Sequence, residues 1–262
     1  FFSINFMKFI ILGCGSSMGV PRPDGFFGNC NLKNKKNHRS RCSALLKTSN
    51  QIALFDTSPD LRQQLINSKV KNIDKVFYSH MHADQTHGIN DLRVFYIKNK
   101  KTIPVYADKA TSKYLFNTFK YCFQNKSKEY PAILKLNSIK KNLFIRDGKK
   151  IVKIKPISVD HGKVKSICYV IDKKLAYISD VSNINENNFK YFKNLKYLII
   201  DCLWFREHPS HLNLENSLKL INKFKPKKSI LTNLHSDLDY DDLKKLLPKN
   251  ITPAYDGLEI KL

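Results

Sequence analysis

The sequence has no segment that could cross a membrane and no cysteine pattern typical of a secreted domain. Nowhere in its 262 residues do about 18 apolar residues follow one another, the length that spanning a bilayer requires. The six cysteines are scattered and form no CxxC pair, in a chain too large to need disulfide bonds. We therefore expect a soluble protein of the reducing cytoplasm that makes no membrane contact.

Acidic residues and arginine are also scarce. The chain has 22 Asp+Glu against 46 Lys+Arg, a formal net charge of +24, and only seven of the basic residues are Arg. A basic surface attracts phosphates and favours nucleic-acid binding. Lysine, however, is a solvated point charge that binds phosphate less specifically than arginine does. Because the charge is spread along the chain, we interpret it mainly as compositional bias, with segment 33–41 (KNKKNHRSR) as one local basic cluster.

Glycine and proline are few, and they form no linker that would divide the chain. The sequence contains 9 Gly and 10 Pro and shows no internal repeat. Its length and its 42% hydrophobic content suit one core, so we predict a single domain over residues 1–262. Residues 1–6 precede Met7, which opens the strand-like segment KFIILGCG. We expect these six residues to be an upstream or non-native extension that contributes little.

Strand-like and helix-like segments alternate along the whole chain. Runs rich in β-branched and aromatic residues predict strands at 8–12, 43–47, 52–55, 75–79, 151–157, 167–171, 175–179, 197–200, 229–232 and 258–261. Apolar residues at helical spacing predict helices at 59–67, 89–98, 110–123, 212–224 and 240–246. This interleaving predicts an α/β layered fold with largely buried sheets.

Several predicted strands end abruptly in a residue that can ionise. Asp56, His80, Asp180 and Asp201 each follow an apolar run. Polar residues at strand ends lie where loops gather above a sheet, which is where α/β enzymes usually hold their sites. We therefore expect these four positions to converge.

The most specific segment is SHMHADQTHGINDLR, residues 79–93. It places His80, His82 and Asp84 two residues apart, directly after a predicted buried strand. Alternation in an extended loop puts the three side chains on one side, where imidazoles and a carboxylate can surround one cation. Further ligands have to come from distant strand ends, and His161, Asp180 and His235 are the candidates in chain order.

This ordered set of motifs resembles the metallo-β-lactamase fold hydrolases, and within them the PhnP-like phosphoribosyl cyclic phosphodiesterases. The resemblance covers nearly the whole chain. It rests on GCGSSMGVPR (13–22), LFDTSPDLR (54–62), the HxHxD segment, VDHG (159–162), ISD (178–180), LTNLH (231–235) and AYDGLEI (254–260). It implies an αβ/βα sandwich of two mixed sheets flanked by helices, and it is compatible with a homodimer.

The resemblance also implies two sites for divalent transition metals, Zn or Mn. The first would comprise His80, His82 and His161; the second would comprise Asp84, Asp180 and His235, with Asp180 bridging the two ions. Relatives usually read HxHxDH, but here Gln85 stands at the final position. A neutral amide oxygen binds borderline metals more weakly than imidazole does. Three outcomes stay open: a weaker second site, a single ion, or replacement by His87. We predict a tight first site and a looser second one.

Roles in catalysis follow from the same resemblance. Hydroxide held by the metal ions would attack phosphorus, with Asp84 as a ligand that takes part in catalysis. His211 would be the general acid or donate a hydrogen bond to the phosphoryl oxygen, and the alternative is that it only caps the helix predicted at 212–224.

From its position at a neighbouring strand end, Asp56 would either accept an N–H from a ligand imidazole or form an Asx turn or cap before Pro59, and His87 would lie behind the ligands or contact the substrate. Arg22 and Arg41, which follow the first turn, would bind a substrate phosphate.

The implied activity is hydrolysis of a small phosphate ester, cyclic esters included, by this phosphodiesterase centre. An RNA-processing nuclease of the same fold is the alternative that the net charge of +24 would suit, although no Gly/Pro-rich insertion interrupts the motifs. A third possibility is a non-catalytic metal- or nucleic-acid-binding relative whose second site has decayed at Gln85.

Overall fold

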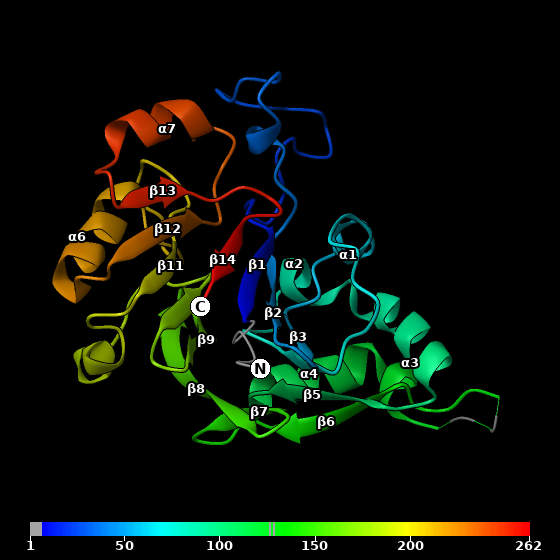
Figure 1. The fold of residues 1–262 in the computed structure, drawn as a ribbon. Helices are drawn as coiled ribbons and strands as arrows, with labels where there is room; N and C mark the ends of the chain where they lie inside the picture. Colours follow the sequence, from blue (N-terminus) through cyan, green and yellow to red (C-terminus); the bar gives the residue numbers. More distant parts are fainter. Residues whose placement is uncertain (1–6, 126, 128) are drawn as a thin grey trace.

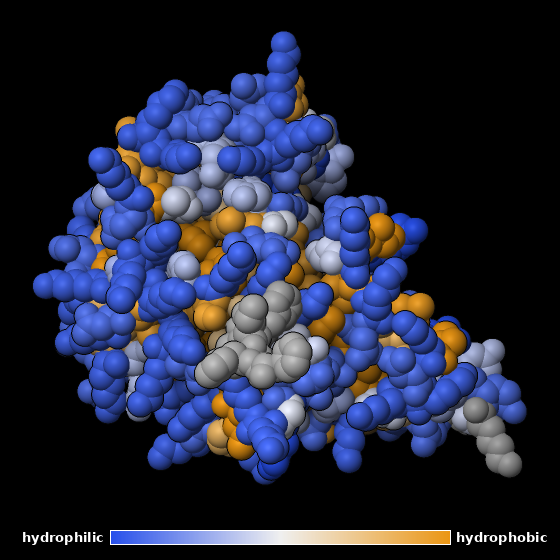
Figure 2. Space-filling view, in the orientation of Figure 1, coloured by the Kyte–Doolittle hydropathy of each residue, from blue (hydrophilic) through white to orange (hydrophobic). Residues whose placement is uncertain are grey.

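The structure is a computed structural model that describes residues 7–125, 127 and 129–262. The six-residue extension considered above lies outside these residues. Among the described helices, none is long and apolar enough to cross a bilayer. Hydrophilic side chains cover most of the face shown in Figure 2, as expected for charge that is spread along the chain.

Fourteen strands in the described residues form two sheets of seven strands each. The first sheet has the order β14-β1-β2-β3-β4-β5-β6 and contains β1 (Lys8–Gly13), β2 (Ser43–Lys47), β3 (Ile52–Phe55), β4 (Lys75–Phe77), β5 (Ile103–Ala107), β6 (Leu134–Ser138) and β14 (Glu259–Lys261). Strands β3 to β6 are parallel, whereas β14, β1, β2 and β3 pair antiparallel.

The second sheet is also mixed. Its order is β13-β12-β11-β10-β9-β8-β7, built from β7 (Leu143–Asp147), β8 (Lys150–His161), β9 (Val164–Ile171), β10 (Leu175–Ile178), β11 (Tyr197–Asp201), β12 (Lys228–Thr232) and β13 (Ile251–Pro253). Strands β10 to β13 are parallel, and β7 to β10 pair antiparallel.

Helices cover the outer face of each sheet. Figure 1 shows α6 and α7 beyond the second sheet, and α1, α3 and α4 beside the first. The helices are α1 (Leu61–Asn67), α2 (Ala83–Thr86), α3 (Arg93–Asn99), α4 (Lys109–Thr118), α5 (Lys120–Phe123), α6 (Leu214–Phe224) and α7 (Tyr240–Leu246), with 3-10 turns at Lys35–Asn37, Ile89–Leu92 and Glu186–Tyr191. The predicted sandwich of two mixed sheets flanked by helices is confirmed.

Alternation along the central strands produces this layering. In β1, Phe9 and Ile11 belong to the hydrophobic cluster between the sheets, whereas Ile10 and Leu12 belong to the cluster under the helices of the first sheet. Successive side chains of a strand point to opposite faces, so a strand covered on both faces is apolar throughout. Such strands show as continuous apolar runs in the sequence.

The structure adds four strands to those predicted: β5, β6, β7 and β13. Pro104 in β5 and Pro253 in β13 weaken the strand pattern, because proline has no N–H for a sheet. The predicted helix 110–123 is two helices, since the backbone at Phe119 leaves the helical region at φ −118 and ψ 38. The predicted helix 89–98 begins as a 3-10 turn before α3.

The cluster between the sheets has an aromatic centre that sets their spacing. The Phe55 side chain is fully buried, and its ring centroid lies 5.4 Å from that of Phe77 in the first sheet. It lies 5.2 Å from the ring centroid of Tyr169 and 5.9 Å from that of Tyr177, both in the second sheet. Phe55 therefore joins the two sheets directly.

Replacing Phe55 by Ala is expected to lower the free energy of unfolding by about 3–5 kcal/mol, because it leaves a cavity between the sheets. Urea denaturation of both proteins measures the difference. Phe144→Ala is the matched control, since that side chain is 51% exposed and its loss should cost about 0.5 kcal/mol or less. Equal losses in the two variants would contradict the role given to Phe55.

Candidate metal centre

The ends of strands from both sheets meet at one edge of the sandwich. His80 and His82 follow β4, His161 ends β8, and Asp180 follows β10. Ligand atoms of His80, His82 and His161 lie within 4.8 Å of one another, as do those of His161, Asp180 and His211. His161 belongs to both groups, so the two groups form one centre.

The three imidazoles of the first group face a common point. His80 Nε2 lies 2.9 Å from His82 Nδ1, which lies 3.2 Å from His161 Nε2. Nitrogens at about 2.0–2.1 Å from a tetrahedral zinc ion are separated by about 3.3 Å, so these spacings fit a bound ion. His80 and His161 are buried and His82 is exposed, which leaves the group open to solvent on one side.

The outer nitrogens of the buried histidines are held by hydrogen bonds. His161 Nδ1 donates to the Ser210 carbonyl at 2.6 Å, and His80 Nδ1 lies 3.0 Å from Ser79 Oγ. These bonds leave each Nε2 lone pair directed inward. Burial lowers the pKa of His80 to about 3 and also lowers that of His161, so both rings are neutral, the form that binds metal.

The residues expected at the second metal site are not brought together in the same way. Neither Asp84 nor His235 belongs to a group of convergent ligand atoms among the described residues. The His235 ring stacks on Trp204 with centroids 4.6 Å apart, and its Nδ1 accepts from the Asp237 N–H at 3.2 Å. The carboxamide of Gln85 donates to both Asp84 and Asp180.

Two residues predicted to lie behind the ligands make other contacts. Asp56 is buried, and its Oδ1 accepts from the Ser79 N–H at 2.7 Å. Among the described residues, the hydrogen bond at His80 Nδ1 is with Ser79 Oγ rather than with Asp56, and Asp56 anchors the loop that carries His80. His87 belongs to no group of convergent ligand atoms within the part of the chain that the structure describes, and its Nε2 lies 3.0 Å from the Tyr114 hydroxyl.

The two arginines predicted to bind substrate phosphate are each paired with a carboxylate. Arg41 binds Asp60 through two nitrogens, with Nε 2.8 Å from Oδ2 and Nη2 2.7 Å from Oδ1. Arg22 pairs with Asp24 at 2.5 Å and lies over the Phe26 ring. In each arginine the carboxylate occupies the face formed by Nε and Nη2, so a phosphate would be bound through the remaining N–H groups of the guanidinium.

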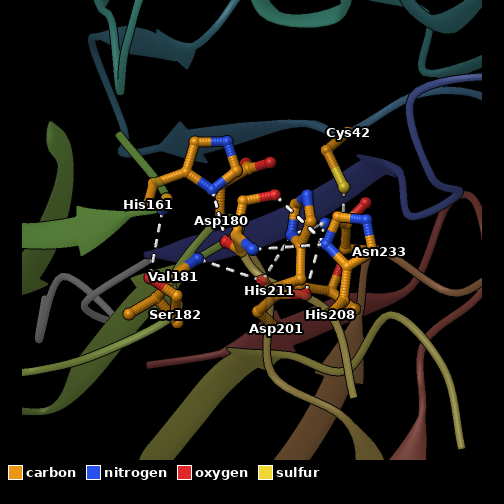
Figure 3. A network of polar contacts seen from close by, with 12 residues as sticks. Cys42, His161, Asp180, Val181, Ser182, Asp201, His208, His211 and Asn233 are labelled. Atoms are coloured by element: carbon orange, nitrogen blue, oxygen red, sulfur yellow. Dashed lines mark hydrogen bonds and ion pairs between the residues drawn. The ribbon is translucent and has the colours of Figure 1, made fainter. Parts of the chain in front are cut away.

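A buried network behind His211 was not assigned a role from the sequence. Asp201 is fully buried at the end of β11, and its Oδ2 lies 2.7 Å from His211 Nδ1 and 3.0 Å from the Val181 N–H (Figure 3). Asn233 donates to the other carboxylate oxygen at 3.2 Å. The signal was the strand end YLIID, which placed Asp201 at the edge without indicating its partner.

Burial and ion pairing have opposite effects on the pKa values of His211 and Asp201. Burial alone would lower the pKa of His211, but the charge and the hydrogen bond of Asp201 raise it to about 9. Burial raises the pKa of Asp201 to about 6, despite the attraction of His211. Both groups are therefore ionised between about pH 6 and pH 9, and the centre contains an imidazolium beside neutral ligand imidazoles.

The chain is similar in sequence and in fold to several known proteins. A family model for the beta-lactamase superfamily domain matches residues 52–233. A solved structure described as a new diphosphatase from the PhnP family is 28% identical, with a TM-score of 0.85 over 98% of this chain and 98% of that one. Zn²⁺-bound PqqB from Methylobacterium extorquens is 16% identical, with a TM-score of 0.75 over 97% of this chain and 100% of that one.

One curated relative is an octanoyltransferase from Porphyromonas gingivalis (strain ATCC BAA-308 / W83). It is 30% identical over 257 residues, which are 97% of this chain and 51% of that protein. The chain thus spans about half the length of this relative.

Replacing Asp201 by Asn is expected to lower the pKa of His211 from about 9 to about 6.5 or below, because the charge is removed while burial remains. NMR titration of the histidine rings in metal-free protein measures this. The raised pKa of His211 contributes stability that is present below about pH 6.5 and lost as the pH rises through about 9. The stability of Asp201→Asn should therefore change less between pH 7 and pH 10.

Asp160→Asn provides the control for this titration, because Asp160 pairs with Lys165 on the surface. It should leave the pKa of His211 unchanged. A pKa that stays near 9 in Asp201→Asn would show that Asp201 is not its cause.

Proposed function

This chain belongs to the β-lactamase superfamily and has the fold of its PhnP-like metallo-hydrolases, and from that premise we propose that it is a metal-dependent phosphodiesterase acting on a small phosphate ester, cyclic esters included. The observation that carries the proposal is the convergence of three imidazoles beside His211, whose Nδ1 lies 2.7 Å from the buried carboxylate of Asp201. The first group suits a Lewis acid, and the second suits a proton donor to an alkoxide leaving group.

The residues that would hold the divalent ion, Zn or Mn, are His80, His82 and His161, with Asp180 as an adjacent carboxylate. Their spacing and their neutral state support this assignment. When bound, such an ion polarises a phosphoryl oxygen and lowers the pKa of water. Since His82 is exposed, a substrate can reach the centre from its side.

His211 would act as the general acid. Asp201 binds its Nδ1, which fixes the ring and leaves Nε2 as the nitrogen that can give a proton. Its ring centroid lies 4.6 Å from that of His161, so a leaving oxygen next to the imidazole ligands would be within its reach. Asp201 then stabilises the imidazolium before the proton is transferred.

Two observations support a phosphate ester as the substrate: the net charge of the chain and its similarity to a PhnP-family protein. The net charge of +24 favours anionic substrates. The 28% identical PhnP-family protein is described as a diphosphatase, which supports cleavage of a phosphorus–oxygen bond. The octanoyltransferase adds no support for acyl transfer here, because the chain matches only half of it.

An RNA-processing nuclease is the second candidate, and one surface feature favours it. A cavity of about 540 Å³ beside Tyr191 is lined by Lys153, Lys155, Lys173, Lys190 and Lys193. Such lysines would bind a phosphate backbone. RNA binding whose affinity falls by about 10³-fold or more between 50 and 200 mM salt, together with RNA cleavage, would favour this candidate over the small-molecule one.

His211→Ala is expected to lower kcat for an ester with an alkoxide leaving group, such as 2′,3′-cyclic AMP, by about 10²–10⁴-fold. Turnover of bis(p-nitrophenyl) phosphate should fall much less, because p-nitrophenolate leaves without a proton. Steady-state kinetics on Zn- or Mn-loaded protein measures both rates, and metal content should be unchanged.

His82→Ala is the companion variant, since it removes an imidazole ligand and should abolish turnover of both substrates. Equal loss of metal and of turnover in His211→Ala would contradict the general-acid role. No turnover of either substrate by the wild-type protein with any divalent metal would instead favour a non-catalytic binding protein.

A further inference from the structure

We infer that this centre binds one divalent ion rather than two. The carboxamide of Gln85 replaces the second cation by donating a hydrogen bond to each of Asp84 and Asp180. The inference rests on the proposed function only for the premise that His80, His82 and His161 bind a metal. It concerns metal content, which can be measured without any assay of hydrolysis.

Gln85 lies between the two carboxylates that would share a second ion. Its side chain is fully buried in α2, and Nε2 lies 3.1 Å from Asp84 Oδ2 and 3.3 Å from Asp180 Oδ2. A carboxamide nitrogen carries two N–H groups, so each carboxylate can receive one. A neutral imidazole carries only one N–H and could not bridge both. Glutamine is therefore suited to hold the two carboxylates together without a cation.

The orientation of the carboxamide follows from the same contacts. Rotating it by half a turn would place Oε1 against two carboxylate oxygens, which repel it. In the observed orientation Oε1 is buried and has no hydrogen-bond partner. A second ion would have to break both N–H bonds and would gain only a neutral amide oxygen, which borderline metals bind more weakly than imidazole.

The other ligand expected for a second ion is held elsewhere. His235 stacks on Trp204, and its Nδ1 accepts the Asp237 N–H, which places the proton of the neutral ring on Nε2. That nitrogen then has no lone pair for a metal. To bind an ion through Nε2, the ring would have to change its tautomer and give up the hydrogen bond from the Asp237 N–H.

His87 does not replace the missing imidazole. Its Nε2 lies 3.0 Å from the Tyr114 hydroxyl, and its ring meets Phe119 edge-on with centroids 5.4 Å apart. Both contacts are with α4 and its C-cap, and His87 belongs to no group of convergent ligand atoms among the residues that the structure describes. Of the three outcomes that the sequence left open, the geometry thus favours the single ion.

Metal content of the full chain tests the inference. Protein loaded with excess Zn²⁺ and desalted should retain about one ion per chain, with any second ion bound about 100-fold more weakly or worse. Gln85→His supplies an imidazole and Gln85→Glu supplies a carboxylate of nearly the same shape, and each should retain about two. After loading with Mn²⁺, electron paramagnetic resonance should show isolated ions in the wild type and a spin-coupled pair in the variants.

His87→Ala is the matched control and should leave the wild-type stoichiometry unchanged. Two tightly held ions in the wild-type protein would overturn the inference, whether or not His87→Ala removes one of them. Failure of both folded Gln85 variants to take up a second ion would overturn the role given to Gln85. Wild-type protein that retains no ion after loading would instead count against the proposed function.

Discussion

The packing of the two sheets against each other determines where every candidate ligand lies. The aromatic rings of both sheets meet between them, and two hydrogen bonds then connect β9 to the loop after β4. The Tyr169 hydroxyl donates to the Tyr78 carbonyl at 2.6 Å, and the Ile167 N–H donates to the Ser79 carbonyl at 2.9 Å. These bonds hold the HxHxD loop of the first sheet against the second sheet. His161 and Asp180 therefore reach the same edge as His80.

Burial of polar groups at this edge has a cost that the structure offsets by pairing. An unpaired buried charge is strongly unfavourable, whereas a buried pair with further hydrogen bonds is tolerated. Asp201 meets this condition through His211, the Val181 N–H and Asn233. The buried ligand imidazoles of His80 and His161 avoid this cost because burial lowers their pKa values and keeps them uncharged. Desolvation thus yields the metal-binding bases, whereas at His211 the pairing with Asp201 outweighs desolvation and yields a proton donor, whose ring centroid lies 4.6 Å from that of His161.

Much of the fold could be predicted, because strands that are buried on both faces are apolar throughout. The bounds of β2, β3 and α7 agree with the predicted ranges, while β5 and β13 were missed where proline interrupts a short run. The first metal group was predictable as well, since HxHxD is a local pattern. The contact of Asp201 with His211 joins a strand end to a loop, and no local pattern indicates which partner such a residue meets.

The sequence by itself determined the layered fold, the family resemblance and the identity of the candidate ligands, because periodicity and short motifs depend on neighbouring residues. Only the tertiary structure decided how those residues are oriented. It turned His235 onto Trp204, placed the amide of Gln85 between two carboxylates and made Ser79, rather than Asp56, the partner of His80. The physical reason is that a side chain's direction depends on the groups that other strands bring to it, and these groups are distant in the sequence.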